Sequence, residues 1–154
     1  MFKEHELKAC ISGSLKKFKP EIDLTIDEFT DLHVKILAPE KWWVNRIRHG
    51  IIIADKGDFR PLPSEINIPV WDVEPKFLHS VSKSDFLYVV DIGGYIGLST
   101  GFEIGFAMAK DIPVFSMEKI AITPEEYGDL WLSEFINKIP VATPKEVVTS
   151  LSVN

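Results

Sequence analysis

The sequence predicts one α/β domain over residues 1–154, built as a three-layer sandwich around a mainly parallel sheet of about five strands. Two observations predict it. Short apolar runs rich in β-formers alternate with longer segments whose apolar residues recur every three or four positions. Turns that contain Ser, Gly or Pro separate the two kinds of segment. Such alternation is typical of a Rossmann-like fold, in which helices cover both faces of a parallel sheet.

The expected strands are short and apolar. The clearest is Phe86–Val90, a continuous run FLYVV that is too short for a helix and therefore suits a strand buried on both faces. The run at 7–11 gives a first strand, which ends on the turn Ser12-Gly13-Ser14. Further strands are expected at 34–37, 51–54, 112–116 and, as a last short one, 140–142.

Helices are expected between these strands. Residues 18–32 place apolar side chains at three- and four-residue spacing, which predicts a helix with one apolar stripe. Residues 74–84 and 101–110 fit two more helices, and the second of them leaves little room for a solvated face. Thr123 and Thr143 each precede a Pro and stand three residues before a Glu, which predicts two capping boxes that begin helices.

The segment between residues 40 and 75 has a looser pattern. A turn is expected at 55–58, which reads DKGD, and three tryptophans lie in the segment: Trp42, Trp43 and Trp71. Aromatic side chains in such a segment either line a pocket that stacks a flat ligand or belong to the core or to a subunit interface.

Composition and charge exclude several classes of protein. A net charge of −6 argues against a dedicated nucleic-acid binder, which needs a clustered excess of Lys and Arg. The first residues, MFKEHELK, lack the apolar core of a signal peptide, and no apolar run approaches the ~20 residues of a membrane span. The single cysteine, Cys10, lies in an apolar run, so a buried and unreactive thiol is expected. We therefore expect a cytoplasmic protein with no nucleic-acid or membrane partner.

Polar residues follow the predicted strands at one edge of the sheet, where ligands bind in parallel α/β folds. Ser12, Gly13 and Ser14 follow the first strand and offer hydroxyl and N–H groups that suit a phosphate or a ribose; a plain turn is the alternative. Asp91 follows the central strand and is expected either as a second polar group of the pocket or as a cap for the glycine turn, which contains Gly93, Gly94 and Gly97. That turn and the next helix start supply the other expected ligand contacts, which are Gly94, Tyr95, Gly97, Ser99 and Thr100.

Glu103 is the carboxylate on which the functional hypothesis rests. It is expected in the first turn of the helix at 101–110, after a cap by Ser99 or Thr100, where the positive end of the helix dipole favours the ionised form. The alternative is a helix-start carboxylate that stabilises its helix by roughly 0.3–1 kcal/mol and has no further role.

Residues 11–14, 84–91 and 99–114 carry a resemblance to a known family. Thr100, Glu103, Gly105, Ala107 and Pro113 occupy the positions of a GT-x-x-E-x-G-x-A helix start and of the proline turn that follows it. Together with the apolar strand that follows Asp85, this pattern resembles the nucleoside 2-deoxyribosyltransferase family. That family includes the 2′-deoxynucleoside 5′-monophosphate N-glycosidases.

The resemblance implies cleavage or transfer at the N-glycosidic bond of a nucleoside or nucleotide, with Glu103 as nucleophile. Asp91, at the end of the central strand, is predicted as a second catalytic group. Such cleavage passes through an oxocarbenium-like state, which a fixed carboxylate stabilises or captures covalently. Hydrolysis results when water completes the reaction, and transfer results when a second base does so. The resemblance also implies a homodimer or higher homo-oligomer with pockets completed by a neighbour. No cofactor or metal is expected.

The chain departs from the family pattern at two places. Six residues before the nucleophile the transferases commonly have Asp and the monophosphate hydrolases have Ser, whereas this chain has Gly97. No carboxylate aligns at 76–79, where the hydrolases have an Asp; His79 or Asp91 is a substitute. A nucleotide-sensing domain without catalysis is therefore an alternative. Another is a phosphoribohydrolase that releases cytokinin bases, because residues 93–103 also resemble the GG-x-GT-x-x-E motif of that class, with an insertion after the glycine pair.

Overall fold

A parallel sheet of four strands forms the centre of the molecule. The structure is a computed structural model that describes residues 5–41, 45–48, 51–54, 69–121 and 130–153. The strands lie in the order β2-β1-β5-β6, and they are β1 (Lys8–Gly13), β2 (Lys35–Ala38), β5 (Phe86–Val90) and β6 (Val114–Ser116). The predicted Rossmann-like α/β fold is confirmed, with four strands in the sheet where the sequence predicts about five.

Two of the expected strands lie outside this sheet. Ile51–Ala54 forms β4, which pairs with β3 (Asn45–Arg48) in an antiparallel hairpin of its own. The expected strand at 140–142 contributes a single parallel bridge between Ser116 and Val141. Because Pro140 has no N–H to extend a ladder, this segment adds little to the sheet beside β6.

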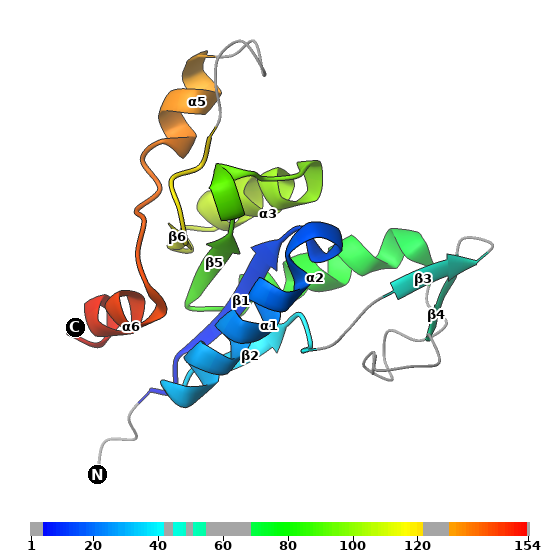
Figure 1. Cartoon of the computed structure of the whole chain (residues 1–154), viewed down its shortest axis with the longest axis horizontal. Helices are drawn as coiled ribbons and strands as arrows, with labels where there is room; N and C mark the ends of the chain where they lie inside the picture. Colours follow the sequence, from blue (N-terminus) through cyan, green and yellow to red (C-terminus); the bar gives the residue numbers. More distant parts are fainter. Residues whose placement is uncertain (1–4, 42–44, 49–50, 55–68, 122–129, 154) are drawn as a thin grey trace.

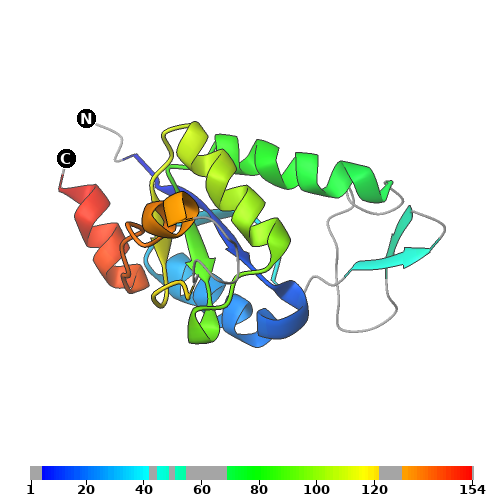
Figure 2. The ribbon, with the colours of Figure 1, turned by 90° about the horizontal axis from the view of Figure 1, so that it is seen from above.

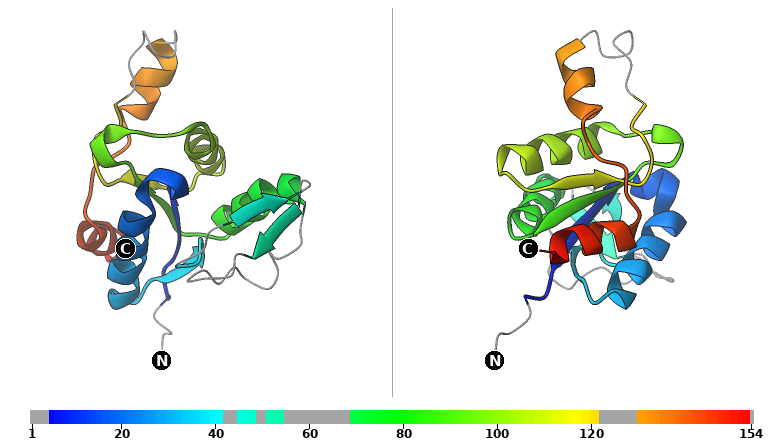
Figure 3. Two further views of the ribbon diagram at one scale, coloured as in Figure 1. Left: turned by 45° about the vertical axis from the view of Figure 1, so that its right-hand side comes forward. Right: turned by 90° about the vertical axis from the view of Figure 1, so that its left-hand side faces the viewer.

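Helices cover both faces of the sheet and make three layers (Figures 1 and 3). One face is covered by α1 (Leu15–Asp31) and α6 (Pro144–Ser152), and the other by α2 (Val73–Ser82) and α3 (Leu98–Ala109). None of the helices in the described ranges is long and apolar enough to span a membrane.

The central strand β5 is buried along its whole length, as the run FLYVV predicts. Phe86, Tyr88 and Val90 belong to the core on the side of α1 and α6. Leu87 and Val89 belong to the core on the side of α2 and α3. This alternation follows from the period of two in a β-strand, and it holds the carboxyl end of β5 between the two helical layers.

Local capping signals begin two of these helices. The Ser14 hydroxyl accepts a hydrogen bond of 3.3 Å from the backbone N–H of Lys17 and caps α1. The predicted capping box at Thr143 is confirmed at the start of α6, where the Thr143 and Glu146 side chains each accept from the other's backbone N–H. The predicted box at Thr123 lies outside the described residues, and the next described helix is α5 (Leu130–Ile136).

The hairpin of β3 and β4 stands away from the sheet, next to the beginning of α2 (Figure 2). The short helical turn η1 (Val70–Asp72) leads into α2 and carries Trp71, whose side chain is exposed rather than in the core. Trp42, Trp43 and the turn expected at 55–58 lie outside the described residues.

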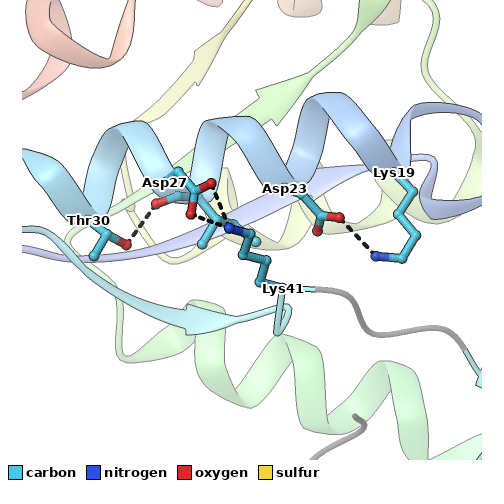
Figure 4. A network of polar contacts seen from close by, with 6 residues as sticks. Lys19, Asp23, Asp27, Thr30 and Lys41 are labelled. Atoms are coloured by element: carbon cyan, nitrogen blue, oxygen red, sulfur yellow. Dashed lines mark hydrogen bonds and ion pairs between the residues drawn. The ribbon is translucent and has the colours of Figure 1, made fainter. Parts of the chain in front are cut away.

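Two lysines pair with carboxylates of α1 (Figure 4). Lys41, which follows β2, places Nζ 2.7 Å from both carboxylate oxygens of Asp27. Within the helix, Lys19 pairs with Asp23 at 3.0 Å. The bidentate contact of Lys41 fastens the chain that leaves β2 against α1, at one side of the molecule.

Candidate functional site

The candidate site lies where β1 and β5 end, at the carboxyl edge of the sheet. Ser12 pairs with Val89 and Gly13 with Val90 in the parallel ladder. A Cβ at Gly13 would come 2.8 Å from the carbonyl oxygen of Val90, which is closer than real side chains approach. Glycine is therefore needed here for the two strand ends to lie side by side, and the ligand contact expected of Gly13 has no separate support.

Ser12 and Glu103 meet across this edge. The Ser12 hydroxyl donates a hydrogen bond to Oε2 of Glu103, and both residues are buried. The sequence predicts Ser12 as part of a loop that binds a phosphate or a ribose. Its hydroxyl instead points to α3 and is occupied by the carboxylate.

Glu103 lies deeper in its helix than the sequence predicts. The helix α3 begins at Leu98 with Gly97 as N-cap and no side-chain cap, so the predicted capping by Ser99 or Thr100 is wrong. Glu103 consequently lies in the second turn, beyond the end where the helix dipole acts on a charge.

The environment of Glu103 favours the protonated form. Its side chain is only 8% exposed. Burial raises the pKa of Glu103 to about 8, the hydrogen bond from Ser12 lowers it, and the nearby charge of Glu74 raises it further. The expectation that the helix dipole keeps this carboxylate ionised is therefore wrong, because Glu103 lies beyond the first turn and burial removes its hydration.

Glu74 lies at this site although the sequence did not predict it there. It lies in the first turn of α2, and its carboxyl group is hydrogen-bonded to that of Glu103. Burial raises the pKa of Glu74 as well, and its Oε1 is buried with no hydrogen-bond partner among the described residues. A signal existed in the sequence: Glu74 stands just before the stretch 76–79, where the family pattern places a carboxylate.

Two buried carboxyl groups in contact titrate as one unit. Burial raises the pKa of both carboxyl groups, so the pair resists carrying two negative charges. Cys10, two residues before Ser12 in β1, has its pKa raised to about 11 by burial and stays neutral beside them. The expected buried cysteine is confirmed. The site therefore brings together two buried carboxyl groups whose pKa values are both raised.

Asp91 does not join this pair in the described part of the chain. Its Oδ1 accepts a hydrogen bond of 2.9 Å from the backbone N–H of Glu118, and the Glu118 side chain accepts one of 2.7 Å from the N–H of Gly93. Burial raises the pKa of Asp91 to about 7, and its Oδ2 is buried without a partner among the described residues. These contacts make Asp91 a clamp between the glycine turn and the chain that follows β6.

The glycine turn is shaped by its neighbours. Gly94 has φ +77°, and a Cβ there would come 2.5 Å from the carbonyl oxygen of Lys119. Its own carbonyl accepts a hydrogen bond of 2.8 Å from Ala121. The Tyr95 ring contacts residues of α1 instead. Lys17 Nζ lies 3.7 Å from its ring centroid, and the centroids of the Tyr95 and Phe18 rings are 6.0 Å apart. Tyr95 therefore connects this turn to the beginning of α1.

The other hydroxyl side chains expected to contact a ligand have different surroundings. Thr100 is buried one turn before Glu103, so both side chains lie on the same face of α3. Ser99 is exposed, and Ser14 uses its hydroxyl as the cap of α1. Ser12, Thr100, Glu103 and Glu74 are thus the polar side chains gathered between the sheet edge, α2 and α3.

No group of three or more His, Cys, Asp or Glu side chains that could hold a metal ion occurs in the described residues. A groove of about 570 Å³ runs along the edge strand β2, between α1 and residues 39–41. It contains none of the residues at the ends of β1 and β5, so the candidate site is defined by its side chains and not by this groove.

Comparisons with known proteins bear on the fold. No protein-family model matches the chain, and no significant match was found among curated proteins. Among solved structures, the chain is similar to a conserved protein from Enterococcus faecalis V583. That crystal structure superposes with a TM-score of 0.58 at 16% sequence identity, over 94% of this chain and 98% of the other. At this identity the likeness shows a shared fold over nearly the whole length of both chains.

Proposed function

We propose that this protein cleaves or transfers the N-glycosidic bond of a (deoxy)nucleoside or nucleoside 5′-monophosphate. The observation that supports the proposal most is the contact of Glu103 with both Ser12 and Glu74 at the carboxyl edge of the sheet. Retaining cleavage of a glycosidic bond needs two carboxyl groups, one as nucleophile and one as acid. Glu103 and Glu74 are two carboxyl groups in contact, one for each of these roles.

In this mechanism Glu103 attacks the anomeric carbon of the sugar while Glu74 donates its proton to the leaving base. The bond from carbon to nitrogen breaks, a sugar ester of Glu103 forms, and Glu74 becomes ionised. Glu74 then accepts a proton from water as that water attacks the ester, and Glu103 is released as a carboxylate. A second base in place of the water gives transfer instead of hydrolysis.

Neighbouring residues fit roles in binding. The Thr100 hydroxyl, on the Glu103 face of α3, suits a sugar hydroxyl. Lys17 and the ring of Tyr95 stand together at the beginning of α1, where an anionic group of a nucleotide would meet a positive charge and a helix N-terminus. Asp91 acts in this proposal through the turn that it clamps.

The proposal includes a homodimer or higher homo-oligomer. Leu98 is 94% and Phe102 is 63% exposed, and they lie one turn apart on α3, the helix that carries Glu103. Covering them with a second copy would remove both apolar side chains from water beside the site. Sedimentation of the chain at micromolar concentration tests this, and a monomer there contradicts it.

Incubation with a panel of nucleosides and nucleoside 5′-monophosphates, with and without a free base, tests the activity. We expect release or exchange of the base, abolished by Glu103→Gln and unchanged by Glu134→Gln, which alters an exposed carboxylate of α5. Release from ribonucleoside monophosphates alone would favour the phosphoribohydrolase alternative. Saturable nucleotide binding without turnover would favour the sensing domain and contradict the proposal.

A further inference from the structure

Tyr95 joins the two segments that leave β1 and β5 at the carboxyl edge of the sheet. The segment after β1 leads into α1, and the glycine turn after β5 leads into α3. These strands are neighbours, while α1 and α3 cover opposite faces of the sheet, so the strand order reverses between them. In open α/β sheets ligands bind at such a switch point. The two segments lie side by side there (Figures 2 and 3), and the ring of Tyr95 connects them.

The candidate site is closed in this structure. Ser12 is 1% and Glu103 is 8% exposed, so a substrate reaches them only after a neighbouring group has moved. Tyr95 lies at this edge of the sheet and is 42% exposed. The next residue, Ile96, is 8% exposed and packs in the core under α3. The ring of Tyr95 can therefore move while the chain that carries it stays in place.

Two consecutive residues of α1 hold this ring. Phe18 packs against the core under α1 and meets the Tyr95 ring edge to face, with the centroids 6.0 Å apart. Lys17 is exposed, its Nζ lies 3.7 Å from the ring centroid, and it pairs with no carboxylate in the described part of the chain. Consecutive side chains of a regular helix point about 100° apart. The helix is interrupted at Phe18 (φ −121°, ψ 25°), and both side chains therefore reach one ring.

We propose that Tyr95 is a gate whose ring closes the way from the carboxyl edge of the sheet to Ser12 and Glu103. An anionic group that binds Lys17 opens this gate. The contact between an exposed ammonium group and a ring is weak, whereas hydrogen bonds from that group to phosphate oxygens are charge-assisted and stronger. The anion thus removes one of the two contacts that hold the ring. One consequence rests on the proposed function: a nucleoside 5′-monophosphate, which carries such a group, enters more readily than a nucleoside.

The first experiment measures opening without any substrate. Ser12→Cys places a thiol behind the gate, and its rate of modification by the thiol reagent DTNB reports how often the way is open. In this parent, Tyr95→Ala is expected to raise the rate about tenfold or more, because both ring contacts are lost. Lys17→Met should raise it about two- to fivefold, the factor that corresponds to an exposed cation–π contact.

Three controls separate the gate from other causes of modification. Tyr95→Phe keeps the ring and should react as the parent does. Phe135→Ala removes an aromatic side chain of similar exposure, 46%, from α5 and should also leave the rate unchanged. In Tyr95→Ala with Ser12 retained, the buried Cys10 is the single thiol and should stay unmodified. Equal rates in Tyr95→Ala and the parent, or modification of Cys10 as fast as of the introduced thiol, overturns the inference.

The second experiment tests the anion. Inorganic phosphate, compared with sodium chloride at the same ionic strength, should speed the modification of Ser12→Cys about two- to fivefold. It should have no effect once Lys17→Met is added. An equal rate in both salts, or an acceleration that persists in Lys17→Met, overturns opening by an anion at this lysine. If Ser12→Cys does not fold, Thr100→Cys is the parent, since Thr100 is buried on the Glu103 face of α3, and the same changes in rate are expected.

The gate and the proposed function fail separately. In the natural chain, Tyr95→Ala should lower the ratio of kcat/KM for a nucleoside 5′-monophosphate to that for its nucleoside, because entry no longer needs an anion. Tyr95→Phe should keep that ratio, and an unchanged ratio in Tyr95→Ala contradicts the role of the gate in substrate choice. A wild type that releases no base overturns the proposed function, and the modification rates still decide whether Tyr95 is a gate.

Discussion

The carboxyl groups of Glu74 and Glu103 are hydrogen-bonded to each other inside the protein, although they come from two different helices. α2 precedes β5 and α3 follows it, and both helices pack on the same face of the sheet. A like-charged pair in such a place is costly unless it keeps a proton. This relationship connects the fold of the protein to its proposed chemistry.

Glu74→Gln should remove the acid of the proposed mechanism. Base release is expected to fall by about 10²–10⁴-fold, the usual contribution of a general acid. The same change should lower the pKa of Glu103, because its contact with the Glu74 carboxyl group, which raises this pKa, is gone. Steady-state kinetics and carboxyl ¹³C titration check the two effects, with Glu134→Gln as the control. Wild-type rates in Glu74→Gln would exclude Glu74 as the acid.

The stability of the protein should fall as the pH rises from about 4.5 to about 8. The pKa of Glu103 is about 8 in the folded chain against an ordinary value of 4.5, so the folded state binds more protons in this interval. The stabilisation is complete below the unfolded pKa and is lost as the pH passes the folded one. Urea unfolding at several pH values checks this, and the slope should be smaller in Glu103→Gln. A stability that rises through this interval in the wild type would contradict the assigned burial.

Asp91→Ala should destabilise the protein, by about 1 kcal/mol, because the N–H of Glu118 loses its acceptor. Asp91→Asn keeps an acceptor oxygen at that place and is expected to cost less. Urea unfolding measures both variants. If Asp91→Asn keeps full stability but loses all base release, Asp91 acts in catalysis and not through the turn that it clamps.

Two glycine substitutions should have opposite effects. Gly94→Ala is expected to destabilise the protein by more than about 1 kcal/mol, since φ is +77° and the new Cβ would lie 2.5 Å from the carbonyl oxygen of Lys119. Gly105→Ala is the matched control: it lies within α3, a Cβ there meets nothing within 4 Å, and alanine should stabilise the helix by roughly 0.5–1 kcal/mol. Thermal unfolding compares them, and a neutral Gly94→Ala would show that the turn relaxes freely.

Much of the fold could be predicted from local pattern. The run FLYVV is buried on both faces as expected, and the capping box at Thr143 begins α6. The fifth strand could not be counted from sequence, because the apolar run at Ile51–Ala54 fits a strand equally well in the sheet or in a separate hairpin. The strand with which Ile51–Ala54 pairs decides between the sheet and the hairpin, and that pairing is not set by the local sequence.

The candidate site, like the fold, could be predicted only in part. Glycines, hydroxyls and a carboxylate after the strands indicate a polar edge, and the sequence by itself determined that Ser12 and Glu103 belong to it, because parallel strands end on one side of a sheet. Only the tertiary structure decided that Ser12 binds Glu103, that Glu74 completes the pair, and that Asp91 turns toward Glu118. Caps and periodicity depend on residues within a few positions of each other, whereas contact and desolvation depend on which faces of distant elements pack together. Burial between those faces gives Glu103 its raised pKa.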